Sequence, residues 1–176
     1  MKIAWSYSSL KTFQQCPKKY YHTRVLKDIK EEDNEATVYG KALHKAAEDY
    51  MRDGTPIPPQ FAFIQETVDA LKKIPGEKYC ELQLGIANRG GKLSSCGFFD
   101  KNVWYRGIAD LLIINDDVGY LVDYKSSKNA KYADLKQLDL LAAAVFTHFP
   151  QLNSLKSALI FVVSNEFVDK IGRAHV

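Results

Sequence analysis

Hydrophobic residues recur along this chain at two different spacings. In the first half, Tyr39, Leu43, Ala47 and Tyr50 follow the three- and four-residue intervals of one helix face. Between residues 79 and 86, apolar and polar side chains alternate instead, which is typical of a strand with one buried face. The chain is therefore predicted to begin with helices and to continue as a β-sheet.

Extended along the whole chain, the pattern predicts a short series of elements. These are two short helices before residue 27, the first capped by Ser8 or Ser9 and the second opened by Pro17, then helices over 39–50 and 61–73, strands over 79–86, 103–114 and 119–125, a helix over 132–148 and a last strand over 158–163. Residues 87–97, rich in Gly, Ser and Asn, are predicted to form a loop. We expect an α/β fold with a central mixed sheet flanked by helices, in which the N-terminal helices are followed by β-β-β-α-β.

The composition is that of one soluble globular domain. The chain has 176 residues, of which 46% are hydrophobic and 26% charged. No apolar run is long enough to cross a bilayer and the N-terminus has no apolar leader, so we expect a cytoplasmic protein without a membrane partner. Three cysteines without a CxxC pair favour reduced thiols, and the net charge of +3 permits a nucleic-acid partner without requiring one.

The last residues are expected to be foreign to the protein. The sequence IGRAHV, residues 171–176, can be encoded by most of a common sequencing adapter. We therefore expect residues 1–170 to form a single domain whose native chain continues past Asp169, and we give His175 no functional role.

Two aspartates interrupt the most hydrophobic stretches of the predicted sheet. Asp110 lies within Ile108–Ile114 and Asp123 within Tyr120–Lys125. A turn centred on residues 116 and 117 places them opposite each other, with Cβ atoms ~5 Å apart, where like charges destabilise a sheet. A divalent cation relieves this repulsion, since carboxylate oxygens are its preferred ligands. Period two then places Lys125 on the same face as Asp123.

An alternative applies to each aspartate taken alone. One could end its strand, and the other could pair with a surface lysine. The matched register and the Asp-x-Lys spacing of Asp123 and Lys125 favour the metal interpretation.

The order of motifs resembles that of the PD-(D/E)XK nuclease superfamily, in particular its RecB-like branch, which includes phage relatives. The motifs concerned are Ser8-Ser9-Leu10 with Phe13, Cys16, Pro17 and Tyr20, then Gly40-Lys41-Ala42-Leu43-His44, Gly107-Ile108-Ala109-Asp110, Asp123-Tyr124-Lys125, and Gln137 in the following helix. The resemblance implies a restriction-endonuclease-like core and hydrolysis of DNA with Mg²⁺ or Mn²⁺.

The resemblance also implies roles for particular residues. The metal would be held by His44, Asp110, Asp123 and the main-chain carbonyl of Tyr124. Lys125 would position or activate the attacking water and stabilise the transition state. Gln137 would contact the substrate or Lys125. The implied activity is that of an exonuclease in DNA repair or recombination.

Three further residues are candidates from their positions in the sequence. Glu81 lies on the polar side of its predicted strand and is expected either to approach the metal site or to face solvent. Lys19 and Tyr20 belong to a basic and aromatic N-terminal stretch that could grip a phosphate backbone and stack on bases, or could form a solvated helix face.

The sequence departs from the family pattern in two places. Leu141 stands four residues after Gln137, where the branch carries a tyrosine. Some members hold an iron–sulfur cluster with one early and three late cysteines. Cys16 fits the early position and the late cysteines are missing, so this chain does not support a cluster, although a longer native chain would leave it open.

Three other functions remain open at this point. The domain could be a catalytically silent DNA-binding or scaffold module, a metal-dependent hydrolase of another substrate, or the nuclease domain of a larger helicase–nuclease. Endonuclease or exonuclease action, polarity, strand preference and the number of metals are also open.

Overall fold

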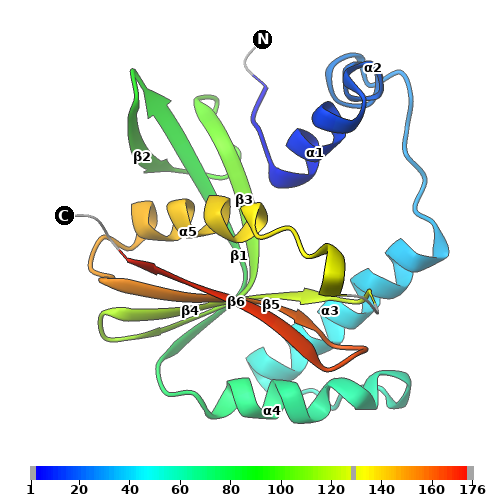
Figure 1. Ribbon diagram of the computed structural model, residues 1–176, viewed down its shortest axis with the longest axis vertical. Coiled ribbons are helices and arrows are strands. Elements are labelled where there is room, and N and C mark those ends of the chain that lie inside the picture. Colours follow the sequence, from blue (N-terminus) through cyan, green and yellow to red (C-terminus); the bar gives the residue numbers. More distant parts are fainter. Residues whose placement is uncertain (1–2, 128–129, 174–176) are drawn as a thin grey trace.

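A six-stranded mixed sheet with helices on both faces forms the body of the protein (Figure 1). The computed structural model describes residues 3–127 and 130–173. The helical elements are α1 (Tyr7–Gln15), α2 (Pro17–Tyr20), the π-helix η1 (Tyr21–Leu26), α3 (Glu35–Asp53), the 3₁₀ helix η2 (Pro59–Ile64), α4 (Gln65–Lys73), the 3₁₀ turn η3 (Ala130–Tyr132) and α5 (Lys136–His148). The strands are β1 (Glu77–Arg89), β2 (Lys92–Cys96), β3 (Val103–Asn115), β4 (Val118–Lys125), β5 (Ser154–Phe161) and β6 (Glu166–Arg173).

The strand order is β2-β1-β3-β4-β5-β6. Neighbouring strands are antiparallel except β4 and β5, which are parallel. A parallel pair needs a crossover, and α5 supplies it. This arrangement confirms the expected α/β class and is consistent with a restriction-endonuclease-like fold.

The register between β3 and β4 is the one expected from the sequence. Asn115 pairs with Val118 and Leu111 with Val122, around a two-residue turn in which Asp116 has a φ of 54°. Aspartate tolerates this left-handed conformation better than most residues. The positions of Asp110 and Asp123 follow directly from this register.

Each face of the sheet has its own hydrophobic core. Helix α3 packs with η2 and α4 on one face, where Leu43 and Ile64 contact a cluster that includes Leu111 and Val122. Helix α5 covers the other face, where Leu141 packs in the cluster that contains Leu112. Figure 1 shows α5 and α4 on opposite sides of the strands.

Several element boundaries differ from the predicted ones. The first helix is capped by Ser6, with Ser9 completing a capping box, rather than by Ser8 or Ser9. Strand β2 lies within the predicted loop 87–97, because Gly90 (φ 62°) and Gly91 (φ 92°) form a two-residue turn that folds the chain back on β1. The helix predicted over 132–148 begins at Lys136 instead.

The sheet also extends past the predicted last strand. Strand β6 pairs antiparallel with β5, and Arg173 is opposite Ser154. Its large apolar side chains are exposed, including Phe167 and Ile171, so its sequence lacks the buried alternation of an internal strand. Residues 171–173 of the expected foreign tail lie in β6, and residues 174–176 with His175 lie outside the described part of the chain.

No helix in the described residues is both long and apolar enough to span a membrane.

Gly76, the residue before β1, provides a test of the fold. Gly76 has a φ of 120°, and a Cβ there would lie 2.3 Å from the Ile114 carbonyl oxygen. We expect Gly76→Ala to lower the free energy of unfolding by about 3 kcal/mol, because backbone atoms must shift to admit the methyl group. Chemical denaturation of the purified variant measures this change.

Gly90→Ala is the matched control. Gly90 also has a positive φ, but a Cβ there meets nothing within 4 Å. The expected loss is about 1 kcal/mol, from the left-handed backbone alone. Equal losses for the two variants would contradict the close approach of Gly76 to β3.

Candidate metal centre

Three carboxylates lie at neighbouring positions on three adjacent strands. Cys80 pairs with Leu111 and Leu82 with Ala109, so the intervening Glu81 is opposite Asp110. On the other side of β3, continuing the register by one position from Leu111 and Val122 places Asp123 opposite Asp110. Directly opposed like charges destabilise a sheet, and here Asp110 has an acid on each side.

The backbone is irregular at the same place. Glu81 has a φ of 50°, in the left-handed region that a side chain other than glycine seldom occupies. Tyr79 and Leu82 both pack in the cluster beneath α5, and so do Ala109 and Leu112 of β3. Strict alternation would place the members of each pair on opposite faces. The alternation therefore slips by one residue at Glu81 and at Asp110, in both strands together.

Helix α3 brings an imidazole to these carboxylates. His44 Nδ1 is 3.3 Å from Asp110 Oδ2, and its ring meets the buried Tyr124 ring edge-on. The helix comes close to the end of β4 at Gly40, where a Cβ would lie 3.2 Å from Ser126 Oγ. The Tyr124 N–H donates to the same Asp110 oxygen at 2.7 Å. One carboxylate oxygen is thus held by both β4 and α3.

His44, Glu81 and Asp110 form one cluster. One ligand atom from each lies within 4.8 Å of the others, and in the part of the chain that the structure describes no other trio of His, Cys, Asp or Glu does so. Of the two acids beside Asp110, the one in this cluster is Glu81, and Asp123 adjoins it. The sequence left Glu81 open between the site and the solvent, and the register with Asp110 is the feature that decides it.

Asp123, Lys125 and Gln137 form a second group beside the cluster. Lys125 Nζ donates to Gln137 Oε1 at 2.8 Å, and the Gln137 amide donates to Asp123 Oδ1. Lys125 also forms an ion pair with Asp123 Oδ2. This buried oxygen nevertheless has no partner in hydrogen-bonding geometry among the described residues. The expected contact between Gln137 and Lys125 is present, and period two does place Lys125 beside Asp123.

Leu141, which stands where a tyrosine was expected, has a packing role. It is buried on the α5 side of the sheet, and a Cβ on Gly107 would lie 2.6 Å from its Cδ2. The glycine therefore makes room for this leucine, which fixes α5 and its Gln137 against β3.

Burial and mutual repulsion change the proton affinities of the site. Burial raises the pKa of Glu81, and the charge of Asp110 raises it further. Burial and Asp110 also raise the pKa of Asp123 to about 6, although Lys125 opposes this. Burial alone would lower the pKa of His44, but the hydrogen bond and the charge of Asp110 have the larger combined effect, so the pKa of His44 is raised. The site therefore holds its negative charge at a cost that a cation would remove.

The residues present fit a divalent cation. One imidazole nitrogen and two carboxylate oxygens converge. Beside them, a buried oxygen of Asp123 is ion-paired with Lys125 but has no partner in hydrogen-bonding geometry among the described residues. Carboxylate-rich donor sets suit Mg²⁺ and Mn²⁺, and the imidazole is compatible with Mn²⁺ and with other transition metals.

The two N-terminal candidates lie apart from the cluster. The Tyr20 ring is buried and stacked on Trp5, with centroids 5.3 Å apart, and Phe13 meets it edge-on. It therefore has no free face for a base, which corrects the expected stacking role. Lys19 Nζ forms an ion pair with Glu31 at 2.7 Å.

Comparison with known proteins supports a nuclease relationship. The family model described as the PD-(D/E)XK nuclease superfamily matches residues 4–77, from the segment before α1 to the first residue of β1. The match includes His44 and ends before the three carboxylates. The chain is therefore similar to this superfamily over its helical N-terminal part.

No curated protein sequence matches the chain. Ten chains of solved structures do match. The crystal structure of SSO0001 is 11% identical, with a TM-score of 0.41, over 96% of this chain and 62% of that one. This chain thus spans less than two thirds of the length of SSO0001.

The repulsion between Glu81 and Asp110 can be tested by substitution of Glu81. Because the pKa of Glu81 is raised, the folded protein binds a proton there that the unfolded chain has already released. Stability is then lost as the pH rises from the ordinary glutamate pKa through the raised one. In EDTA at pH 8, we expect Glu81→Gln to raise the Tm by about 3 °C, with a smaller difference near pH 4.

Glu32→Gln, in the exposed segment before α3, is the matched control and should leave the Tm unchanged. Thermal melts with and without Mn²⁺ complete the test. We expect Mn²⁺ to stabilise the parent protein and the control, and to stabilise Glu81→Gln much less. A Glu81→Gln variant that is less stable than the parent in EDTA would contradict the repulsion.

Proposed function

We propose that this protein is a divalent-metal-dependent nuclease that hydrolyses phosphodiester bonds of DNA. The observation that carries the proposal is the meeting of His44, Glu81 and Asp110 beside an aspartate and a lysine fixed by Gln137. The similarity of residues 4–77 to the PD-(D/E)XK nuclease superfamily supports the same reaction class.

The cluster residues His44, Glu81 and Asp110 would hold the cation together with their strand neighbour Asp123. Asp110 is the central ligand because it contacts His44 and has an acid on each side. Asp123 offers a buried oxygen that is ion-paired with Lys125 but has no partner in hydrogen-bonding geometry among the described residues. Glu81 and the main-chain carbonyl of Tyr124 complete the proposed set. When bound, the cation lowers the pKa of coordinated water and neutralises charge on the phosphate.

Lys125 is the proposed catalytic cation of the chain. The Lys125 side chain is partly exposed, whereas the Asp123 side chain beside it is almost completely buried. It can therefore reach a phosphate oxygen or the attacking water and stabilise negative charge that grows on the phosphate. Water attacks phosphorus as the bond to the sugar oxygen breaks, which leaves a 5′-phosphate on one product.

Gln137 is a positioning residue in this proposal. Its amide oxygen accepts from Lys125 and its amide nitrogen donates to Asp123, so one side chain fixes the lysine relative to the carboxylate. Because α5 carries Gln137 and packs on Gly107 of β3, its position is determined by the core.

The motif set extends the proposal to the RecB-like branch. We propose an exonuclease that acts from DNA ends in the cytoplasm, in repair or recombination, alone or joined to a helicase. The combination of Gly40-Lys41-Ala42-Leu43-His44 with Gln137 after the Asp-x-Lys strand supports this placement.

The proposal is tested by cleavage assays on four DNA substrates, namely linear and circular, single- and double-stranded. We expect the parent protein to degrade DNA with Mg²⁺ or Mn²⁺ and to be inactive with a chelator. Asp123→Ala and Lys125→Ala should each lower the rate roughly 100-fold or more, because each removes charge stabilisation at the reacting phosphate.

Asp116→Asn is the matched control, because Asp116 is an exposed turn residue whose left-handed φ asparagine tolerates. It should cleave at the parent rate. Degradation of linear but not circular DNA would support an exonuclease. Equal activity of the parent and both alanine variants would refute the assignment.

A further inference from the structure

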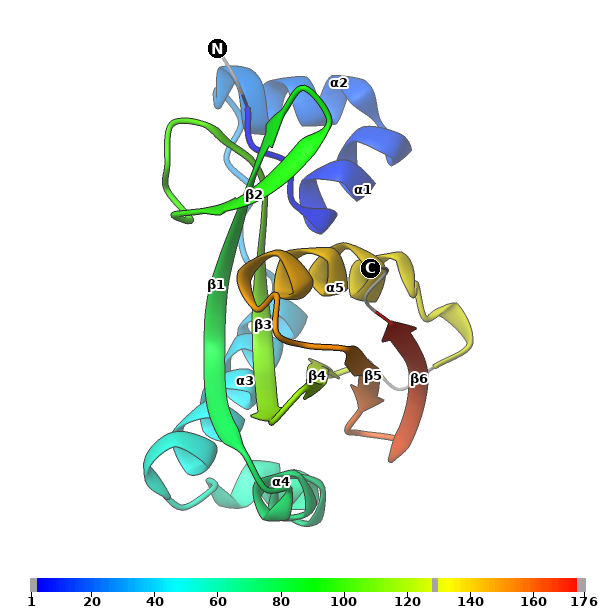
Figure 2. The ribbon, with the colours of Figure 1, turned by 90° about the vertical axis from the view of Figure 1, so that its left-hand side faces the viewer.

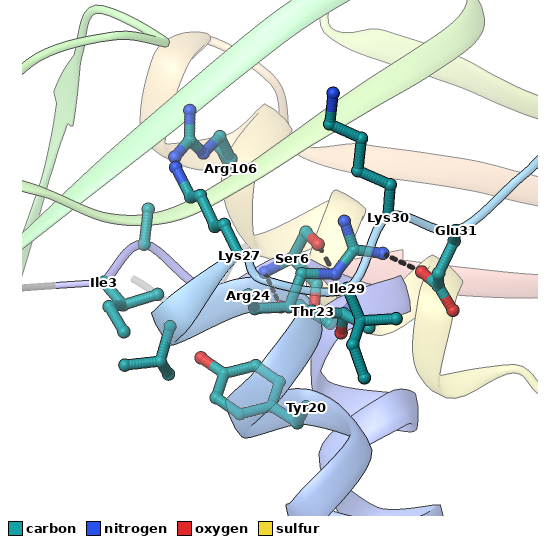
Figure 3. A pocket seen from close by; sticks show the side chains of 13 residues that line it. Ile3, Ser6, Tyr20, Thr23, Arg24, Lys27, Ile29, Lys30, Glu31 and Arg106 are labelled. Carbon is teal, nitrogen blue, oxygen red and sulfur yellow. Dashed lines mark hydrogen bonds and ion pairs between the residues drawn. The ribbon is translucent and has the colours of Figure 1, made fainter.

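A basic pocket lies between the N-terminal helices and β3, away from the carboxylates. Its volume is about 730 Å³, and its wall is formed by η1, the segment after it, the residues before α1, and Arg106. Figure 3 shows the Arg24, Lys27 and Lys30 side chains from the helical side and Arg106 from the strand around this space. The proposed reaction does not use any of these four residues.

The charge of this pocket is largely uncompensated. Four cationic side chains line it and one carboxylate, Glu31, faces them. Glu31 pairs with Arg24 at 3.1 Å and with Lys19 at 2.7 Å. Over residues 3–127 and 130–173, Lys27, Lys30 and Arg106 have no ion pair with an acid. Three cations thus share a concave wall without a counter-ion, which is an arrangement that attracts an anion.

Main-chain hydrogen bonds join the segment before α1 to β3 at the wall of the pocket. The Trp5 N–H donates to the Trp104 carbonyl at 2.7 Å, and the Arg106 N–H donates to the Trp5 carbonyl at 2.8 Å. The buried Tyr20 ring stacks on Trp5 and supports the helical wall. The Phe98 ring lies 5.5 Å from the Arg106 guanidinium and holds it from the other side. These hydrogen bonds and ring contacts therefore hold the walls of the pocket together.

A second pocket adjoins this one and reaches Gln137 beside the carboxylates. Its volume is about 370 Å³, it shares Ser6 and Arg106 with the basic pocket, and its far wall includes Gln137. Gln137 is the side chain that contacts both Lys125 and Asp123. Along β3, Arg106 is four residues from Asp110, or ~13 Å at the rise of a strand. The two pockets share part of their lining and together extend from the basic side chains to Gln137.

The second pocket suits one nucleic-acid strand. Aromatic and apolar side chains line it, and those of Tyr7 and Ile108 are exposed enough to contact a base. A duplex, with a major groove alone ~12 Å wide, is too large for this space. A single strand that passes through it would present its next phosphates to Arg106 and Lys30.

We propose that the basic pocket binds a backbone phosphate of a single DNA strand while another phosphodiester of the same strand is cut at the metal centre. This inference rests on the proposed nuclease function. The affinity for DNA then depends on strand length, because a strand too short to reach the pocket from the metal centre lacks this phosphate contact.

The test measures binding of fluorescent oligothymidylates of increasing length in EDTA, where no cleavage occurs. Arg106→Gln and Lys30→Gln are compared with Lys73→Gln, which removes one exposed lysine of α4 at the opposite end of the molecule (Figure 2). We expect each pocket variant to weaken binding of long oligonucleotides about fivefold. The slope of the logarithm of the binding constant against the logarithm of the salt concentration should fall by about one, which corresponds to the loss of one phosphate contact. Lys73→Gln should match the parent, and thermal melts verify that all variants fold.

Several outcomes separate this inference from the nuclease proposal. Parent-like affinity and salt slope for both pocket variants would overturn the pocket, even if the protein cleaves DNA. Pocket-dependent binding in a protein that never cleaves would retain the pocket and refute the nuclease. Equal binding of polyglutamate, or of an oligonucleotide with uncharged methylphosphonate linkages, would also overturn a phosphate site. Weakening that is restricted to oligonucleotides long enough to span both pockets is the expected result.

Discussion

Electrostatic repulsion among three carboxylates is the constraint on which this structure depends. Glu81, Asp110 and Asp123 occupy neighbouring positions on β1, β3 and β4, where hydrogen-bonded strands force their backbones close together. At this place Glu81 has a left-handed backbone conformation. Burial and the charge of Asp110 raise the pKa values of Glu81 and Asp123. A bound cation would offset the repulsion among these carboxylates.

The surrounding fold serves to hold these groups from both sides of the sheet. Helix α3 delivers His44 from one face, while α5 delivers Gln137 from the other and so fixes Lys125. The slip in alternation at Glu81 and Asp110 places the acids between the two hydrophobic cores. The long β1 and β3 strands then continue toward the N-terminal helices, so β3 carries both Asp110 of the carboxylate cluster and Arg106 of the basic pocket (Figure 2).

Much of this arrangement could be predicted from local sequence patterns. Alternation and turn position determined the β3–β4 register, and with it the pairing of Asp110 and Asp123, because a strand has a fixed period of two. Glu81 could not be assigned in the same way, since its place depends on the long-range pairing of β1 with β3 and on a backbone irregularity. Strand β6 was missed because an exposed edge strand lacks an apolar face, and the buried Tyr20 because its neighbour Trp5 lies in a segment with no periodic signal. The place of Arg106 in the basic pocket could not be predicted, because it depends on long-range packing of the N-terminal helical segment against β3.

A divalent cation bound between Glu81, Asp110 and Asp123 would relieve their repulsion, and an anomalous difference map from crystals grown with Mn²⁺ can locate it. We expect one strong peak ~2 Å from an Asp110 oxygen and within coordination distance of His44 and at least one of the two flanking carboxylates. A map with no peak there, and with the acids still bonded only to protein groups at saturating Mn²⁺, would contradict this expectation.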